Sequence, residues 1–182
     1  NNSTPGDILI LSSRYELRWG NFIVPEKQKN LRFIFFDKNN KKLTKEDAFK
    51  EWKNEVYLLV KELNLKGVNI VLFSSFPTFE KNRVNDTNPQ WFNSIQSNNS
   101  IPRQLLRDNY FKIDSFFISL SKNNDNVFYF DIFDLLCPDS NKECFQNRNY
   151  RDQWHLSAEG SLFIYPEFIK FLESNDLLDP VR

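Results

Sequence analysis

Asp7-Ile-Leu-Ile-Leu-Ser12 is a short, uninterrupted apolar stretch near the beginning of the chain. Val68-Asn-Ile-Val-Leu-Phe73 and Val127-Phe-Tyr-Phe-Asp131 have the same character further along. Strands of a parallel sheet have such near-continuous apolar sequences, because helices cover both faces of the sheet. We therefore expect these three stretches to form strands of a mainly parallel sheet.

Helical patterns separate these stretches. A first helix is expected to begin at Thr44, where Asp47 is placed for a contact resembling a capping box, and to stop near Gly67. A second helix begins at Pro102, a residue that suits the first turn. Apolar residues recur at helical spacing in both, namely Phe49, Trp52, Val56, Leu59, Val60 and Leu63 in the first and Leu106, Tyr110, Ile113, Phe117 and Leu120 in the second.

A last helix can be capped by Ser157 and is expected to run to about residue 173. The alternation of strands and helices predicts an α/β fold, a three-layer α/β/α sandwich built on the mainly parallel sheet. Residues 31–36 fit either a strand or a packed loop, and residues 77–100 have the composition of a long loop. We expect residues 1–182 to form a single domain.

The composition gives no support for nucleic acid or a membrane as a partner of this chain. The chain carries 24 basic and 24 acidic residues, so its charge gives no indication of binding to nucleic acid or to an anionic membrane. No apolar run approaches the roughly 18 residues of a membrane-spanning helix. The sequence contains no Met and therefore does not begin at a start codon. We expect it to be a processed product or the C-terminal part of a longer protein.

Cys137 and Cys144 are the two cysteines of the chain, seven positions apart. Two thiols alone make a poor zinc site, and we expect no metal and no cofactor. A disulfide between them would stabilise the fold by roughly 2.5 kcal/mol on the chain-entropy model and would indicate an oxidising compartment. The alternative is two reduced, unrelated thiols in a cytosolic protein.

His155 is the only histidine, in the stretch Tyr150-Arg-Asp-Gln-Trp-His-Leu-Ser-Ala-Glu-Gly160. An imidazole can act as both base and acid near neutral pH. Asp152, three residues upstream, can accept a hydrogen bond from one ring nitrogen and leave the other free to take a proton. The alternative is a loop that enters a helix and whose histidine only satisfies hydrogen bonds. Trp154 fits either stacking on a sugar ring or packing of the loop onto the core.

Three features together resemble the SGNH hydrolase fold, and more narrowly the SGNH domain fused to bacterial membrane acyltransferases of the O-antigen acetylase type. The most specific is the Cys-Pro-x5-Cys loop followed by Tyr-Arg-Asp-x-x-His-Leu-Ser-x-x-Gly, from Cys137 to Gly160. The second is the strand that runs into a proline turn, Phe73-Ser-Ser-Phe-Pro-Thr-Phe79. The third is the strand Asp7–Leu11 that ends in Ser-Ser-Arg-Tyr. The resemblance covers roughly residues 6–175.

The resemblance implies a flavodoxin-like α/β/α sandwich that acts on O-linked acyl groups of surface polysaccharides. It implies that His155 is the general base and that Asp152 orients it. A serine would attack an ester carbonyl, and the acyl group would pass from that serine to a sugar hydroxyl or to water.

The sequence departs from this family in its nucleophile. The Gly-Asp-Ser-His stretch of the family is absent, so we expect the nucleophile and its strand to precede residue 1. Ser12 and Ser13 end the first apolar stretch and are alternative nucleophiles or residues that line the site. They have no glycine neighbours, although nucleophile elbows usually do. Arg14 is a candidate for substrate contact.

The predicted function is therefore acyl transfer to carbohydrate hydroxyls by an extracytoplasmic SGNH domain, tethered to the inner membrane through a linked acyltransferase domain. One alternative is a carbohydrate O-acyl esterase, in which water accepts the acyl group. The other is a non-catalytic domain of the same fold that binds or scaffolds glycans. The expected partners are a carbohydrate or acyl-ester substrate and the linked membrane domain.

Overall fold

The computed structural model describes residues 4–12, 19, 34–79, 100–152 and 154–178. Its central sheet has three strands in the order β1 (Ile8–Leu11), β4 (Asn69–Phe73) and β6 (Val127–Phe130). Both pairings are parallel, with Ile10 opposite Val71 and Val71 opposite Phe128. The three apolar stretches of the sequence are thus strands of one parallel sheet, as predicted.

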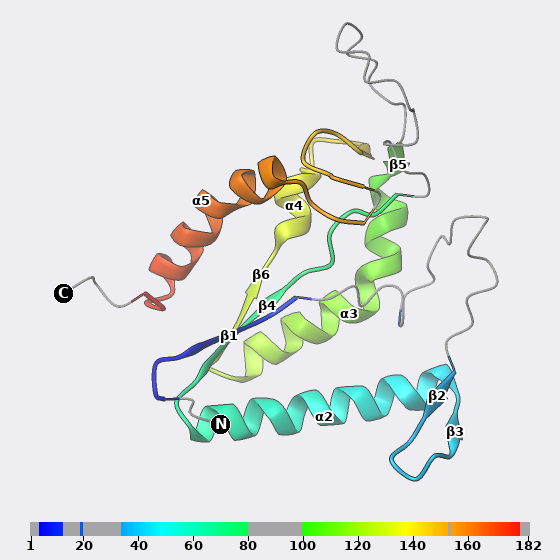
Figure 1. The fold of residues 1–182 in the computed structure, drawn as a ribbon, viewed down its shortest axis with the longest axis vertical. Coiled ribbons are helices and arrows are strands. Elements are labelled where there is room, and N and C mark those ends of the chain that lie inside the picture. Colours follow the sequence, from blue (N-terminus) through cyan, green and yellow to red (C-terminus); the bar gives the residue numbers. More distant parts are fainter. Residues whose placement is uncertain (1–3, 13–18, 20–33, 80–99, 153, 179–182) are drawn as a thin grey trace, which may run out of the picture.

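Helices cover both faces of this sheet (Figure 1). Helix α2 (Lys45–Leu65) connects β1 to β4, and α3 (Arg103–Asn123) connects β4 to β6. Right-handed crossovers that advance in one direction place their helices on one face of a sheet. The short helix α4 (Ile132–Leu136) and the long α5 (Ala158–Ser174) follow β6 and pack on the opposite face. The fold is therefore the predicted α/β/α sandwich.

Alternate residues of the strands divide the apolar interior into two clusters. Ile70 and Leu72 face α2 and α3, where Trp19, Phe49 and residues of the second half of α3 complete one cluster. Val71 belongs to the other cluster, together with residues of α4 and α5. Because both faces of the central strand are covered, Ile70, Val71 and Leu72 are all fully buried. This explains the continuous apolar sequence of β4.

The ends of α2 follow the signals in the sequence. The Thr44 hydroxyl accepts from the backbone N–H of Asp47, as an N-cap does, and itself donates to the Asp47 carboxylate. At the other end, Gly67 has a φ of 67° and donates to the carbonyl of Asn64, while Val68 donates to that of Leu63. These two bonds form a Schellman motif, which leads the chain directly into β4.

Among the described residues, four short strands lie outside the central sheet. Strands β2 (Phe35–Phe36) and β3 (Lys42–Leu43) form an antiparallel hairpin around the turn of residues 37–41. Strand β5 (Ser100–Pro102) pairs antiparallel with β7 (Glu143–Phe145). The sequence pattern predicted none of β5, β7 and α4 (Ile132–Leu136). The segment from 31 to 33 and the loop from 80 to 99 lie outside the described residues.

One edge of the sheet is open in the described part of the chain. Strand β1 pairs only with β4, and no described strand lies on its other side. Ile10 of β1 points to the same face as Val71 but is 46% exposed, whereas Val71 is fully buried. An apolar residue in the middle of a strand with half of its surface exposed indicates a position that a further element would cover.

Candidate active site

The segment from Tyr150 to Leu156 forms a closed loop between β7 and α5. An antiparallel bridge pairs Tyr150 with Leu156, and the backbone N–H of Arg151 donates to the carbonyl of His155 at 2.9 Å. The Tyr150 ring is buried and packs edge-on against Phe79, with 5.0 Å between ring centroids. Phe79 lies shortly after the carboxyl end of β4, so the loop is seated beyond the carboxyl ends of the sheet. This is the edge where sheets of this type bind ligands.

Within this loop Asp152 and His155 are paired, as the sequence predicted. His155 Nδ1 lies 2.9 Å from Asp152 Oδ1 and 2.8 Å from Oδ2. A carboxylate can only accept, so the neutral ring carries its proton on Nδ1, and Nε2 is left as the acceptor. The His155 side chain is 55% exposed, whereas that of Asp152 is only 21% exposed. The imidazole therefore presents Nε2 away from a sheltered carboxylate.

Asp152 also shapes the loop that carries the histidine. Its Oδ1 accepts from the backbone N–H groups of Trp154 and His155, both at 2.8 Å. Partial burial would by itself raise the pKa of Asp152, but the bonds from Trp154 N–H and from the backbone and ring of His155 outweigh it and lower the pKa. Asp152 is therefore held as a carboxylate that orients the ring.

The loop leads directly into α5. Ser157 is the N-cap of this helix, as predicted, and its hydroxyl accepts from the N–H of Gly160 at 3.0 Å. The same hydroxyl donates to the carbonyl of Arg148 at 2.6 Å, and the Ser157 N–H donates to that of Asn149 at 2.8 Å. The first turn of α5 thus holds the residues that precede the loop.

Of the other residues predicted to react with or contact the substrate, the structure describes only Ser12 and Trp154. Ser12 is exposed at the carboxyl end of β1, and no hydrogen bond joins it to His155 in the described part of the chain. Ser13 and Arg14 lie outside the described residues. Trp154 is partly buried, and its backbone bond to Asp152 places it within the turn. The structure thus brings together Asp152, Trp154 and His155.

Cys137 and Cys144 form a disulfide, and both are fully buried. Cys144 is the middle residue of β7, where it lies opposite Ile101 of β5. The disulfide therefore ties the pairing of β5 and β7 to the end of α4. Arg103, the first residue of α3, reinforces the junction because its Nε donates to the carbonyl of Cys137 at 3.0 Å.

A partly buried ionic cluster lies beside α4 and was missed from the sequence. Arg107 of α3 contacts Asp131 at 3.1 Å and Asp114 at 3.8 Å, and it also bonds to Asp134. Burial alone would lower the pKa of Arg107, but Asp131 and Asp134 outweigh it and raise the pKa. The sequence did contain two signals for this cluster. Arg103 and Arg107 are four residues apart on a predicted helix, and Asp131 and Asp134 lie at the end of a predicted strand and just after it.

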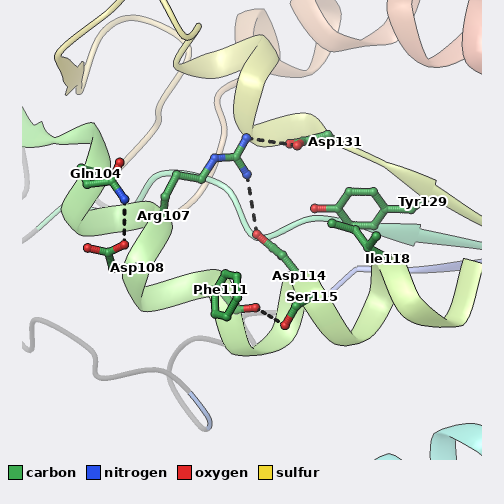
Figure 2. Close-up of a pocket in the computed structure, with 9 residues that line it drawn as sticks. All are labelled: Gln104, Arg107, Asp108, Phe111, Asp114, Ser115, Ile118, Tyr129 and Asp131. Atoms are coloured by element: carbon green, nitrogen blue, oxygen red, sulfur yellow. Dashed lines mark hydrogen bonds and ion pairs between the residues drawn. The ribbon is translucent and has the colours of Figure 1, made fainter.

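This cluster borders a cavity of about 310 Å³ between α3 and the end of β6 (Figure 2). Asp114, Tyr129 and Asp131 line it together with Arg107, and Phe111 lies at 70% exposure. Burial and then the nearby Asp114 and Asp131 raise the pKa of Tyr129, so its hydroxyl stays neutral. None of the described residues of the Tyr150–Leu156 loop lines this cavity, which is distinct from the Asp152–His155 pair.

The described residues include neither a candidate metal site nor a helix that could span a membrane. They hold no group of three or more His, Cys, Asp or Glu side chains placed to bind a metal ion. Among the helices in that part of the chain, none combines the length and the apolar character needed to cross a membrane.

Comparison with known proteins identifies the family. The family model of the SGNH domain, described as fused to AT3 domains, matches residues 1–170. No curated protein and no solved structure matched the chain. The match spans nearly the whole sequence, including every strand of the sheet and the Asp152–His155 loop. The chain therefore belongs to the family of SGNH domains that occur fused to AT3 domains, a class of acyltransferase-associated domain.

Proposed function

We propose that this domain transfers acetyl or similar acyl groups to hydroxyls of a cell-surface polysaccharide by a Ser-His-Asp mechanism. The observation that carries the proposal is the geometry of His155, whose Nδ1 lies 2.8 Å from Asp152 while 55% of the side chain is exposed. A sheltered carboxylate, a fixed imidazole and an outward nitrogen are the base and orienter of a nucleophile–base–orienter triad. Membership of an acyltransferase-associated family supports acyl groups as the substrate.

In this mechanism Nε2 of His155 takes the proton of a serine hydroxyl as the serine oxygen bonds to the carbonyl carbon of an acyl ester. The imidazolium then returns that proton to the departing alcohol, which leaves an acyl-serine. In the second half, Nε2 takes the proton of a sugar hydroxyl that attacks the acyl-serine, and the proton returns to the serine. Asp152 stabilises the imidazolium at each stage and stays ionised, in keeping with its lowered pKa.

The proposal places the nucleophile on a segment outside the described residues. Ser12 ends β1 at the correct edge of the sheet but is not bonded to His155. The outer edge of β1 is unpaired in the described chain, and Ile10 beside it is 46% exposed. A further parallel strand at this edge would cover Ile10, and its own carboxyl end would lie on the same side of the sheet as the histidine loop. We propose that this strand belongs to a preceding part of a longer protein.

The proposal also places the domain outside the cytoplasm, tethered to the inner membrane by the linked domain. The buried disulfide between Cys137 and Cys144 supports this placement, because such bonds persist in oxidising compartments. The family description, fusion to AT3 domains, supports the linked domain.

The test uses the full-length protein with an acyl-ester donor and a glycan acceptor. Acylated glycan and free acid are counted for the wild type and for His155→Ala, Asp152→Asn and the control Lys170→Ala, whose side chain is 68% exposed on α5. His155→Ala should lose acyl transfer by at least ~10³-fold and Asp152→Asn by a factor of up to ~10⁴, because the amide cannot hold the ring in the correct tautomer. Unchanged transfer by His155→Ala would refute the assignment.

Two other outcomes distinguish the alternatives. Free acid without acylated glycan would indicate an esterase, since the same residues then deliver the acyl group to water. A fluorophosphonate probe labels an activated serine, so a full-length protein that binds the glycan but does not react with the probe would be a glycan-binding domain.

A further inference from the structure

The position of His155 depends on where the loop from Tyr150 to Leu156 is seated. The loop is closed by its own bridge and by the bond from Arg151 N–H to the carbonyl of His155. Asp152 adds its bonds inside the loop. The imidazole and its carboxylate therefore move together with the loop. What fixes the loop relative to the rest of the domain also fixes the ring.

The loop is attached to the first turn of α5 through Arg148 and Asn149. Ser157 bonds to the carbonyls of both residues, at 2.6 and 2.8 Å. Beside these bonds the backbone of Asn149 lies directly against Gly160. A Cβ on Gly160 would be 2.1 Å from the carbonyl oxygen of Asn149, 2.9 Å from its carbonyl carbon and 3.0 Å from its Cα.

This contact leaves no room for any side chain at Gly160. All three of the nearest atoms belong to the backbone of Asn149, so rotation of a side chain cannot relieve the clash. Gly160 lies inside α5 and does not have a positive φ, so the helix itself does not require glycine there. Alanine would in fact favour the helix over glycine. The glycine is explained by the approach of Asn149 alone.

We propose that Gly160 is a positioning residue for His155. Its missing side chain lets residues 148–149 lie on the first turn of α5, and this contact sets the position of the loop that carries Asp152 and His155. The inference rests on the proposed function of His155, and it gives the Ser157-x-x-Gly160 part of the motif a physical role. Ser157 supplies the hydrogen bonds to the carbonyls of Arg148 and Asn149, and the absence of a side chain at Gly160 allows the backbone of Asn149 to approach the helix.

The test substitutes Gly160→Ala in the full chain and uses Ser161→Ala as the control in the same turn. His155 is the only histidine, so its ring gives a single set of imidazole signals in a long-range ¹H–¹⁵N NMR spectrum. The wild type and Ser161→Ala should show the proton on Nδ1. Gly160→Ala should keep that proton on Nδ1, because Asp152 moves with the ring, but its ring signals should shift, with amide changes concentrated in residues 147–157.

In the full-length protein, Gly160→Ala should lower kcat on the order of 10²-fold with little change in KM, the effect of about 1 Å of misplacement of a reacting group. If Gly160→Ala does not fold, Ser157→Ala provides the same test from the other side. It leaves Gly160 unchanged but removes the hydroxyl's bonds to Arg148 and to the Gly160 N–H, and it should also shift the ring signals.

Two results separate this inference from the proposed function. If His155→Ala abolishes transfer while folded Gly160→Ala or Ser157→Ala keeps the wild-type ring signals and kcat, the positioning role is wrong and the function stands. If Gly160→Ala alters the ring signals while His155→Ala transfers acyl groups normally, Gly160 positions the ring, but the ring is not the base.

Discussion

At the residue scale, the Asp152 carboxylate both stabilises a backbone turn and orients the His155 ring. Its Oδ1 accepts from the backbone N–H groups of Trp154 and His155, and the two carboxylate oxygens lie within 2.9 Å of the imidazole Nδ1. The backbone bonds make the chain turn back on itself, and the turn brings the ring to the carboxylate. The spacing Asp-x-x-His thus produces both the turn and the pair, without support from a distant element.

The acid dependence of stability follows from this arrangement. The pKa of Asp152 is lower in the folded protein than in the unfolded chain, so the folded state favours the carboxylate. Its contribution to stability is fully present above the ordinary Asp pKa of about 3.9, and it is lost as the pH falls through the folded value. The free energy of unfolding of the wild type should therefore exceed that of Asp152→Asn at pH 6, and the difference should shrink towards pH 3.

Urea unfolding at a series of pH values measures this difference. Arg151 and His155 also face the carboxylate, so the series is repeated in a His155→Gln background, which leaves the two backbone bonds and Arg151 in place. The difference should be smaller there but should vanish over the same acid range. A difference that stays constant from pH 6 to pH 3 would show that the charge of Asp152 plays no part.

At the scale of elements, Arg107 connects α3 to the start of α4. It bonds to Asp131 and Asp134 and lies over the Phe133 ring, 4.1 Å from the centroid. Arg107→Gln would leave partly buried carboxylates without their cation, and we expect it to lower the free energy of unfolding by about 1.5–3 kcal/mol. Arg148→Gln is the matched control, because Arg148 is 86% exposed and its pair with Glu159 should contribute under about 1 kcal/mol.

Chemical denaturation of the two variants measures both values. Equal effects of Arg107→Gln and Arg148→Gln would mean that the cluster around Arg107 is as weak as a surface ion pair.

The disulfide acts on the pairing of β5 with β7. Cys144 lies in β7 opposite Ile101, and its bond to Cys137 closes a short loop. Replacing both cysteines by alanine should lower the free energy of unfolding by about 2.5 kcal/mol, because the unfolded chain regains the entropy of the open loop. Urea unfolding with and without a reductant is the measurement. A wild type whose thiols are demonstrably reduced, yet whose midpoint is unchanged, would contradict this expectation.

These elements also show what the sequence could predict. Strand β4 and helix α2 were predictable because their signals are local: an apolar run, the cap at Thr44 and the stop at Gly67. The pair Asp152–His155 was predictable for the same reason. Strands β5 and β7 were not, because each has three residues and exists only through pairing across more than 40 positions of the chain. The fit of Asn149 against Gly160 is likewise a contact between backbones, which a list of side chains does not reveal.

At the scale of the whole molecule, the two faces of the sheet are covered to different extents at β1. On the α2 and α3 face, Leu11 of β1 is partly buried against the core cluster. On the opposite face, Ile10 is 46% exposed, and α5 carries Leu162, Phe163 and Tyr165 at 52–70% exposure. Helix α5 begins near α4 in Figure 1 and packs on the sheet through Phe168, whose ring contacts Phe73 of β4 and Phe130 of β6. The open edge and the exposed Ile10 therefore fit the proposal that a further strand belongs beside β1.

Ile10 tests that proposal directly. In the chain of 182 residues, Ile10→Asp should lower the free energy of unfolding by only about 1 kcal/mol, because water already reaches the side chain. In a protein extended upstream of Asn1, the side chains of β4 and of the added strand would flank the same aspartate on this face of the sheet and leave it without a partner, and the loss should reach about 3 kcal/mol or more. Leu65→Asp is the control, since Leu65 is 89% exposed on α2 and should give a small, equal loss in both proteins. Urea unfolding of the four variants and their parents gives the comparison. An equal effect of Ile10→Asp in the two proteins would mean that the edge of β1 stays open, and the nucleophile would then have to be sought elsewhere.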